Sequence, residues 1–111
     1  MITRLICDVR GTLIGNEGGH SGAACLQAVQ DLAEAGCQVT LVSASPDPEP
    51  WCGLRVEDKG AWLTAERCAG AFWVDDDTAI LRAVVRLGAI AVPAASLIDL
   101  SAALSRREVR Q

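Results

Sequence analysis

The sequence predicts an α/β fold, built as a small, doubly wound, Rossmann-like parallel sheet. Short apolar runs alternate with segments whose apolar residues recur at helical spacing, and this alternation continues along the chain. Three of the apolar runs end at carboxylates or hydroxyls, as expected at the sheet edge where open α/β sheets bind ligands. A chain of 111 residues has room for one core, so we expect a single domain over residues 1–111.

The first predicted strand covers residues 5–7, an apolar run that ends at Asp8 and precedes a glycine-rich stretch. Apolar residues then recur at helical spacing between positions 26 and 33. Ser21 is the expected N-cap of this helix, and Gly36 stands where a C-terminal cap belongs. This segment is therefore predicted to be a crossover helix.

A second apolar, β-branched run at residues 39–42 predicts the second strand, which stops at Ser43 and is followed by Ser45. Three prolines between positions 46 and 50 exclude regular structure directly afterwards. A short third strand is expected within residues 51–56.

Asp58 is the expected N-cap of a helix that runs on to Gly70. The apolar residues 71–74 then predict a fourth strand, which ends at three consecutive carboxylates, residues 75–77. The last of them, Asp77, is interpreted as the N-cap of the following helix rather than as a site residue.

That next helix is predicted from the inward-facing apolar residues between 80 and 87, and it closes at Gly88. Residues 89–92 predict a last short strand ended by Pro93. Ser96 is the expected N-cap of a final helix. The whole chain therefore alternates between strand and helix, as parallel sheets require.

Composition excludes several classes of protein. Half of the residues are hydrophobic and 22% are charged, which is typical of a globular chain. The net charge of −4 argues against nucleic-acid binding by general electrostatic attraction. No apolar segment approaches the length of a membrane span, and the five cysteines form no C-x-x-C pair. We expect a cytoplasmic protein with reduced cysteines and no membrane partner.

Polar residues stand at the ends of three predicted strands: Asp8, Ser43, and the pair Asp75 and Asp76. Parallel strands bring their carboxyl ends to one edge, so these groups are expected to lie close together. Neighbouring carboxylates repel each other, and a hard cation such as Mg²⁺ is the usual reason to assemble them. A carboxylate can also attack phosphorus, while hydroxyl and ammonium groups bind phosphoryl oxygens.

Residues 8–14, Asp-Val-Arg-Gly-Thr-Leu-Ile, resemble the D-x-D-G-T-[LV] signature of the haloacid dehalogenase-like (HAD-like) superfamily. Further pieces follow in that family's order: Ser43 after the second strand, Lys59 at a helix start, and Asp75-Asp76 after the fourth strand. The resemblance spans residues 2 to about 100. It implies a HAD-like core, and no inter-element segment is long enough to form the family's usual cap domain.

By this resemblance, the site binds Mg²⁺ through the carboxylates of Asp8, Asp75 and Asp76. The main-chain carbonyl of Arg10 would be the fourth protein ligand. Metal binding therefore does not depend on the Arg10 side chain, because the family uses the backbone at that position.

The resemblance also implies that Asp8 is the catalytic nucleophile, that Thr12 orients the first loop at the phosphate site, and that Ser43 and Lys59 hold the phosphoryl group. The implied activity is a phosphohydrolase that forms an aspartyl-phosphate. An uncapped site is open, which suits a small phosphate ester, a phosphorylated macromolecule, or a lid lent by another subunit of a homo-oligomer.

Arg10 is the important departure, because it replaces the second Asp, the general acid and base of the family's phosphatases. A guanidinium stays protonated and has no acceptor, so it cannot activate water. Loss of a general acid-base group typically slows an enzyme by roughly 10²- to 10⁴-fold. The arginine therefore predicts either a slow enzyme or a protein without activity. Arg10 could instead bind a substrate anion, or pair with Asp8 and displace the metal.

Two assignments have competitors. Ser45 competes with Ser43 for the hydroxyl of the motif, and either can be a turn residue. Arg55 or Arg67 could supply the positive charge in place of Lys59. These alternatives remain open from the sequence.

Three functional hypotheses follow. The leading one is a Mg²⁺-dependent, HAD-like phosphohydrolase that acts through Asp8. The second is a non-catalytic binding or regulatory protein that keeps the fold. The third is a subunit of an assembly, with Trp51 or Trp62 exposed at the contact.

Overall fold

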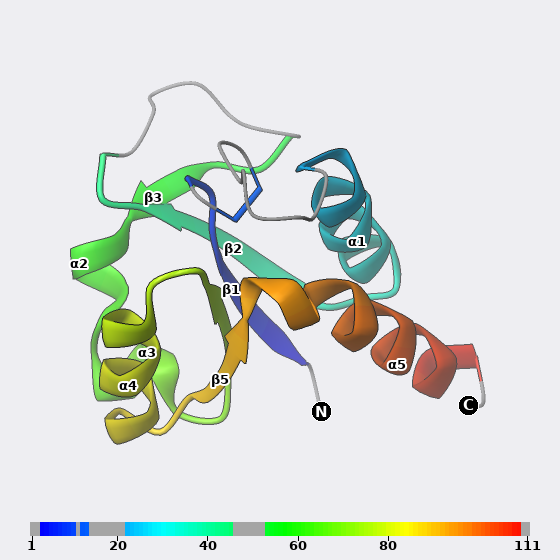
Figure 1. Ribbon diagram of the computed structural model, residues 1–111. Helices are drawn as coiled ribbons and strands as arrows, with labels where there is room; N and C mark the ends of the chain where they lie inside the picture. Colours follow the sequence, from blue (N-terminus) through cyan, green and yellow to red (C-terminus); the bar gives the residue numbers. More distant parts are fainter. Residues whose placement is uncertain (1–2, 11, 14–21, 46–52, 110–111) are drawn as a thin grey trace.

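The computed structural model describes residues 3–10, 12–13, 22–45 and 53–109. Within them, five parallel strands form one sheet in the order β3-β2-β1-β4-β5 (Figure 1). The strands are β1 (Arg4–Asp8), β2 (Gln38–Ser43), β3 (Val56–Asp58), β4 (Phe72–Asp75) and β5 (Ile90–Pro93). The helices are α1 (Gly22–Glu34), α2 (Lys59–Trp62), α3 (Ala65–Cys68), α4 (Thr78–Arg86) and α5 (Leu97–Val109), with a 3₁₀ turn, η1 (Ala94–Ser96), before α5. The predicted fold class, a small doubly wound parallel sheet, is confirmed.

Strand β1 lies at the centre of the sheet and pairs with both β2 and β4. The chain moves outward from β1 through β2 to β3, then returns to the other side of β1 through β4 to β5. The order of strands therefore reverses between β1 and β4. Open α/β sheets bind their ligands outside the carboxyl ends of the strands at such a reversal.

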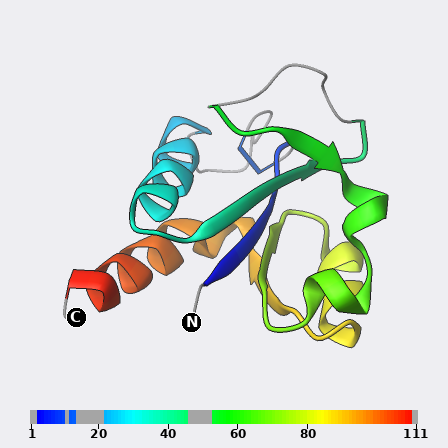
Figure 2. The ribbon, with the colours of Figure 1, turned by 180° about the vertical axis from the view of Figure 1, so that it is seen from behind.

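Helices α1 and α5 cover one face of the sheet, which we call the first face (Figures 1 and 2). Helix α1 places Val29 and Leu32 against strand residues such as Leu5 and Leu41, and all four side chains are fully buried. The apolar residues of α1 recur at helical spacing, so burying one side of the helix stabilises both the helix and the sheet.

Helices α2, α3 and α4 lie on the opposite face, the second face (Figure 2). Its core contains Ile6 from β1, Trp73 from β4 and Val84 from α4. Successive residues of a strand point to opposite faces, so residues 4, 6 and 8 of β1 share the second face.

Two predicted elements differ from the structure. The third strand is Val56–Asp58 rather than a segment within residues 51–56, since Val56, Glu57 and Asp58 pair with the end of β2. The single predicted helix between Asp58 and Gly70 is two one-turn helices, α2 and α3.

The helix divides because a second cap lies inside it. Asp58 caps α2 as predicted, since its carboxylate accepts a hydrogen bond from the amide of Ala61 at 3.2 Å. Leu63 then leaves the helical conformation, and the Thr64 hydroxyl accepts from the amide of Arg67 at 3.3 Å. A threonine hydroxyl that accepts a hydrogen bond from an amide three residues later marks the start of a new helix. The apolar spacing continues across this break, so the prediction of one continuous helix was wrong.

Other end signals match the structure. Asp77 caps α4 by accepting from the amide of Ala79 at 2.9 Å, and Gly36 has the positive φ of 98° expected after α1. The structure corrects one expectation: Pro93 is the last residue of the edge strand β5 rather than a residue beyond it. Ser96 is the last residue of the 3₁₀ turn η1 and directly precedes α5, so its role as an N-cap stays a prediction.

The predicted cap Ser21, the residues 15–21 and the residues 46–52 lie outside the described part of the chain. Within that part, no helix is long and apolar enough to cross a membrane. Cys7, Cys25 and Cys68 are buried thiols, as expected, and burial raises the pKa of each.

Candidate functional site

The carboxyl ends of β1 and β4 bring two buried carboxylates together. Cys7 of β1 pairs with Val74 of β4, so the next residues, Asp8 and Asp75, stand side by side at the strand ends. Asp8 is 2% exposed and Asp75 is fully buried. Both follow apolar residues in their strands, and the strand alternation turns both toward the second face.

Lys59 lies between these two carboxylates. Its Nζ is 2.8 Å from Oδ1 of Asp8 and 3.0 Å from Oδ2 of Asp75. Lys59 is the only lysine of the sequence, and it is the first residue of α2, directly after the capping residue Asp58. The cap of α2 therefore fixes where this ammonium enters the site.

Asp75 accepts two more hydrogen bonds. The indole Nε1–H of Trp73 donates to Oδ2 at 3.2 Å, and the amide of Asp77 donates to Oδ1 at 3.0 Å. Asp8 has a second partner as well, because the Thr12 hydroxyl donates to its Oδ2 at 3.3 Å. Each buried carboxylate is thus held through both of its oxygens.

Burial raises the pKa of Asp8 to about 6, and this effect outweighs the lowering by the hydrogen bond and charge of Lys59. The negative charge of Asp75 raises the pKa of Asp8 further. At neutral pH, Asp8 is therefore mostly ionised, but it is much more basic than an exposed aspartate.

The pKa of Lys59 is raised above its ordinary value. Burial alone would lower it, but the hydrogen bonds and charges of Asp8 and Asp75 outweigh burial. Lys59 therefore stays protonated at neutral pH, and its ammonium is a permanent positive charge in the site.

A third carboxylate completes the group. Asp8, Asp75 and the exposed Asp76 each offer a ligand oxygen, and these oxygens all lie within 4.8 Å of one another. With Lys59, the three carboxylates leave a formal charge of −2, which matches one divalent cation. Oxygen ligands of this kind suit Mg²⁺, so the donor set fits the cation that the sequence predicted.

Ser43 is buried at the end of β2, and its hydroxyl interacts with the backbone of Ser45. The hydroxyl accepts from the amide of Ser45 at 3.3 Å, an arrangement typical of a turn. Among the described residues, Ser43 makes no hydrogen bond to the carboxylates. The structure therefore does not decide between Ser43 and Ser45.

Arg10 is exposed just beyond the end of β1. Within the described part of the chain, the ion pair of Asp8 is formed by Lys59 and not by Arg10. Of the alternative cations, Arg67 stacks over Trp62, with 4.2 Å between the guanidinium carbon and the ring centroid, and Arg55 is exposed. Lys59 is the cation that the fold brings to the carboxylates.

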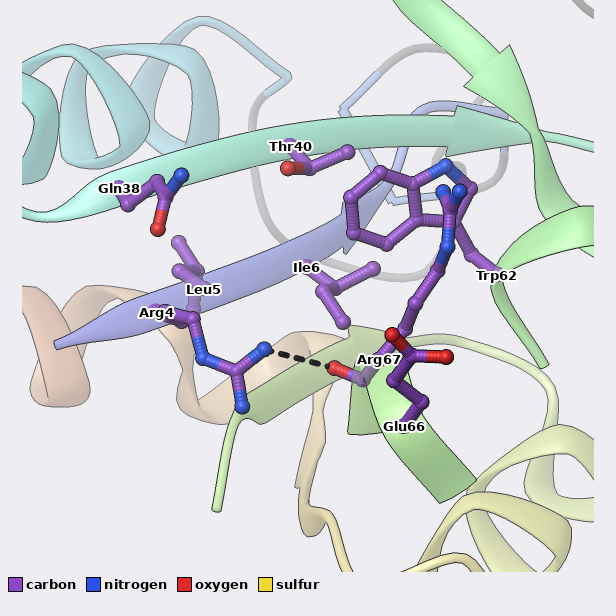
Figure 3. Close-up of a pocket in the computed structure, with 8 residues that line it drawn as sticks. All are labelled: Arg4, Leu5, Ile6, Gln38, Thr40, Trp62, Glu66 and Arg67. Atoms are coloured by element: carbon purple, nitrogen blue, oxygen red, sulfur yellow. Dashed lines mark hydrogen bonds between the residues drawn. The ribbon is translucent and has the colours of Figure 1, made fainter. Parts of the chain in front are cut away.

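A separate hollow of about 220 Å³ lies on the second face, at the amino ends of β1 and β2 (Figure 3). Arg4 and Gln38 lie at these strand beginnings, while Trp62, Glu66 and Arg67 come from α2 and α3. The carboxylates and Lys59 are not among the residues that line this hollow, whereas the alternative cation Arg67 is, so the hollow is distinct from the carboxylate group.

Sequence reasoning missed two contacts of the site. It assigned Trp73 only to a strand, and it did not connect Lys59 with Asp75. The alternation of β4 could have indicated the first contact, because residues 73 and 75 of a strand share a face. The second depends on the path from β3 into α2, which the sequence did not predict correctly.

The fold and the site together define a small parallel α/β protein with a lysine-bridged carboxylate group at its topological switch point. No protein-family model, curated protein or solved structure matches the chain.

Proposed function

We propose that this protein is a Mg²⁺-dependent phosphohydrolase of the HAD-like type, acting through Asp8 on a phosphate ester. One observation carries the proposal. Lys59 bridges the buried carboxylates of Asp8 and Asp75 at the switch point, and Asp76 adds a third carboxylate beside them. The substrate is a small phosphate ester or a phosphorylated macromolecule.

In this proposal Asp8 is the nucleophile. One of its oxygens forms a bond to phosphorus while the bond between phosphorus and the ester oxygen breaks, and the leaving alkoxide takes its proton from water. A second water then attacks the aspartyl-phosphate, which releases phosphate and restores Asp8. The pKa of about 6 supports this role, because Asp8 is ionised at neutral pH yet more nucleophilic than an ordinary carboxylate.

The neighbouring groups have distinct tasks. The Lys59 ammonium, 2.8 Å from Asp8 Oδ1, supplies positive charge to phosphoryl oxygens, and the Thr12 hydroxyl holds the other Asp8 oxygen. Asp8, Asp75 and Asp76 hold Mg²⁺ together with the Arg10 carbonyl. The bound cation supplies further positive charge against the phosphoryl group.

Arg10 makes the proposed enzyme slow or specialised. Its guanidinium cannot take a proton from the attacking water, so this step proceeds without a general base at position 10. Arg10 is exposed two residues after Asp8, and in this proposal its guanidinium binds an additional anionic group of the substrate.

The second candidate is a non-catalytic binding protein, and the specific observation that favours it is Arg10 itself. The other described residues of the motif have side chains suited to their proposed roles, whereas the arginine at position 10 cannot act as a general acid or base. Such a protein would bind phosphate groups at Lys59 without cleaving them.

The test is phosphate release from an aryl phosphate and a panel of phosphorylated metabolites, with and without Mg²⁺. We expect slow, metal-dependent release by the wild type and none by Asp8→Asn. Asp31→Asn is the matched control, because Asp31 is an exposed aspartate of α1 whose carboxylate accepts a hydrogen bond from Gln27.

Arg10→Asp distinguishes the two candidates. If the remaining machinery is complete, this variant should gain about 10²-fold or more in rate, the contribution of a restored general acid-base group. Arg82→Asp, on the exposed side of α4, controls for the change in charge. Absence of turnover in both the wild type and Arg10→Asp would favour the binding protein.

A further inference from the structure

Trp73 makes a polar contact that packing alone does not require. Its ring is fully buried in the core of the second face, together with Ile6 and Val84. Its Nε1–H is directed to the carboxylate two residues further along β4 and donates to Asp75 Oδ2 at 3.2 Å. A phenylalanine would fill most of the same space without an N–H that needs an acceptor.

We propose that Trp73 is a positioning residue for the cation site, holding the Asp75 carboxylate in the orientation that Mg²⁺ requires. This inference rests on the function proposed above, and it assigns a specific task to a residue outside the predicted motif. Trp73 acts through Asp75 and has no contact of its own with the substrate or the cation.

The hydrogen bonds of Asp75 support this role. A carboxylate has about four acceptor positions, two on each oxygen. Oδ2 accepts from Lys59 and Trp73, and Oδ1 accepts from the amide of Asp77. Three positions are therefore engaged, and the remaining capacity lies on Oδ1. The indole N–H thus directs Asp75 to offer one oxygen rather than both.

Trp73 is also the most rigidly held side-chain donor to Asp75. Lys59 reaches the carboxylate through a flexible four-carbon stem, and it must also serve Asp8. The Trp73 ring is enclosed by the core and has only two rotatable side-chain bonds. Groups that hold a metal-binding carboxylate in this way typically change metal affinity by about 10- to 100-fold when they are removed.

The experiment follows Mg²⁺ binding in two ways on the full chain. The three tryptophans give three indole N–H resonances in a ¹⁵N-labelled sample, assigned with Trp→Phe variants. We expect MgCl₂ to shift the Trp73 resonance and to leave the Trp62 resonance in place, because Trp62 stacks against Arg67 beside the hollow at the amino ends of the strands. Calorimetry should show about tenfold weaker Mg²⁺ binding by Trp73→Phe.

Two variants separate positioning from packing. Val84→Ala weakens the same core without touching Asp75, so it should lower thermal stability but keep the Mg²⁺ affinity of the wild type. Trp62→Phe should also keep that affinity. Equal weakening by Val84→Ala and Trp73→Phe would mean that only packing matters and would overturn the proposal.

The outcomes distinguish this inference from the proposed function. If Mg²⁺ binds to the wild type while the Trp73 resonance stays in place, the role of Trp73 is refuted and the cation site stands. The same conclusion follows if Trp73→Phe binds Mg²⁺ as tightly as the wild type. If the wild type does not bind Mg²⁺ at all, both proposals fail. The wild-type resonance decides the matter even if Trp73→Phe does not fold.

Discussion

The two faces of the sheet are covered in different ways. The first face lies under α1 and α5, which have 13 residues each, and its core contains apolar strand side chains such as Leu5, Leu41 and Val74. The second face lies under α2 and α3, of four residues each, and the nine-residue α4. It carries the ion pairs of Lys59 and, at the other end of β1, the hollow of Figure 3.

The difference in helix length accompanies a difference in what the two faces bury. A long amphipathic helix covers several strands and leaves no room for a buried charge. The helices α2 and α3 are too short to cover the strands continuously. Lys59 contacts Asp8 and Asp75 at the carboxyl ends of the strands, and Trp62 borders the hollow at their amino ends. The first face therefore has the larger apolar core, and the second face carries the ion-paired carboxylates.

Lys59→Met should have the largest effect on stability, because it removes the ammonium between Asp8 and Asp75 but keeps an unbranched side chain. Two buried carboxylates would then face each other without a counter-charge, and loss of one partner of a buried ion pair typically costs about 3 to 5 kcal/mol. Chemical denaturation in EDTA measures the loss of free energy of unfolding. Mg²⁺ should restore part of it, and an unchanged stability would show that the ion pairs contribute nothing.

A matched pair of core variants compares the two faces directly. Leu41→Ala on the first face and Ile6→Ala on the second remove equal numbers of carbon atoms from side chains that are at most 2% exposed. We expect a loss of about 4 kcal/mol for Leu41→Ala and about 2 kcal/mol for Ile6→Ala, within the usual range for such truncations. The smaller value follows because Ile6 already borders the hollow, so less new packing is lost.

Denaturation of both variants under the same conditions, without metal, measures this difference. Equal losses would mean that the second face is packed as tightly as the first beside the hollow. A larger loss for Ile6→Ala would reverse the comparison.

Asp8→Asn tests whether the site is kept at the expense of stability. The folded pKa of Asp8, about 6, lies above the ordinary value of 3.8, so protonation favours the folded protein. This stability is fully present below the unfolded pKa and is lost as the pH rises through about 6. At pH 7.5 without metal, Asp8→Asn should therefore be more stable than the wild type, by at most about 3 kcal/mol.

The pH dependence of that gain is the decisive measurement. The gain should shrink between pH 6 and pH 4, where Asp8 of the wild type takes up its proton. Mg²⁺ at pH 7.5 should stabilise the wild type but not the variant. A variant that is less stable than the wild type at pH 7.5 in EDTA would show that the contact with Lys59 outweighs burial.

The sequence predicted the first face better than the second. Helix α1 and its glycine end follow from apolar spacing and a local cap, and both are confirmed. The group of Asp8, Asp75 and Asp76 was also foreseen, because strand ends in a parallel sheet converge. The end of α2 at Leu63 and the start of α3 at Thr64 were not foreseen. Thr64 can act as an N-cap only because the preceding helix ends at Leu63, and the apolar spacing does not show that end. The contacts of Lys59 with both carboxylates were also not foreseen, because they depend on the three-dimensional path from β3 into α2.

Arg67→Ala should have the smallest effect, and it tests whether the hollow and the carboxylate group are independent. The guanidinium of Arg67 stacks on Trp62 at a partly exposed position, where such a contact contributes about 0.5 kcal/mol. Its backbone carbonyl, which accepts from Arg4, remains in the variant. We therefore expect a slight loss of thermal stability, a change in Trp62 fluorescence and an unaltered Mg²⁺ affinity, with Arg82→Ala as the control. Weaker Mg²⁺ binding by Arg67→Ala would mean that Trp62 transmits changes along α2 to Lys59, and that the two ends of the second face act as one unit.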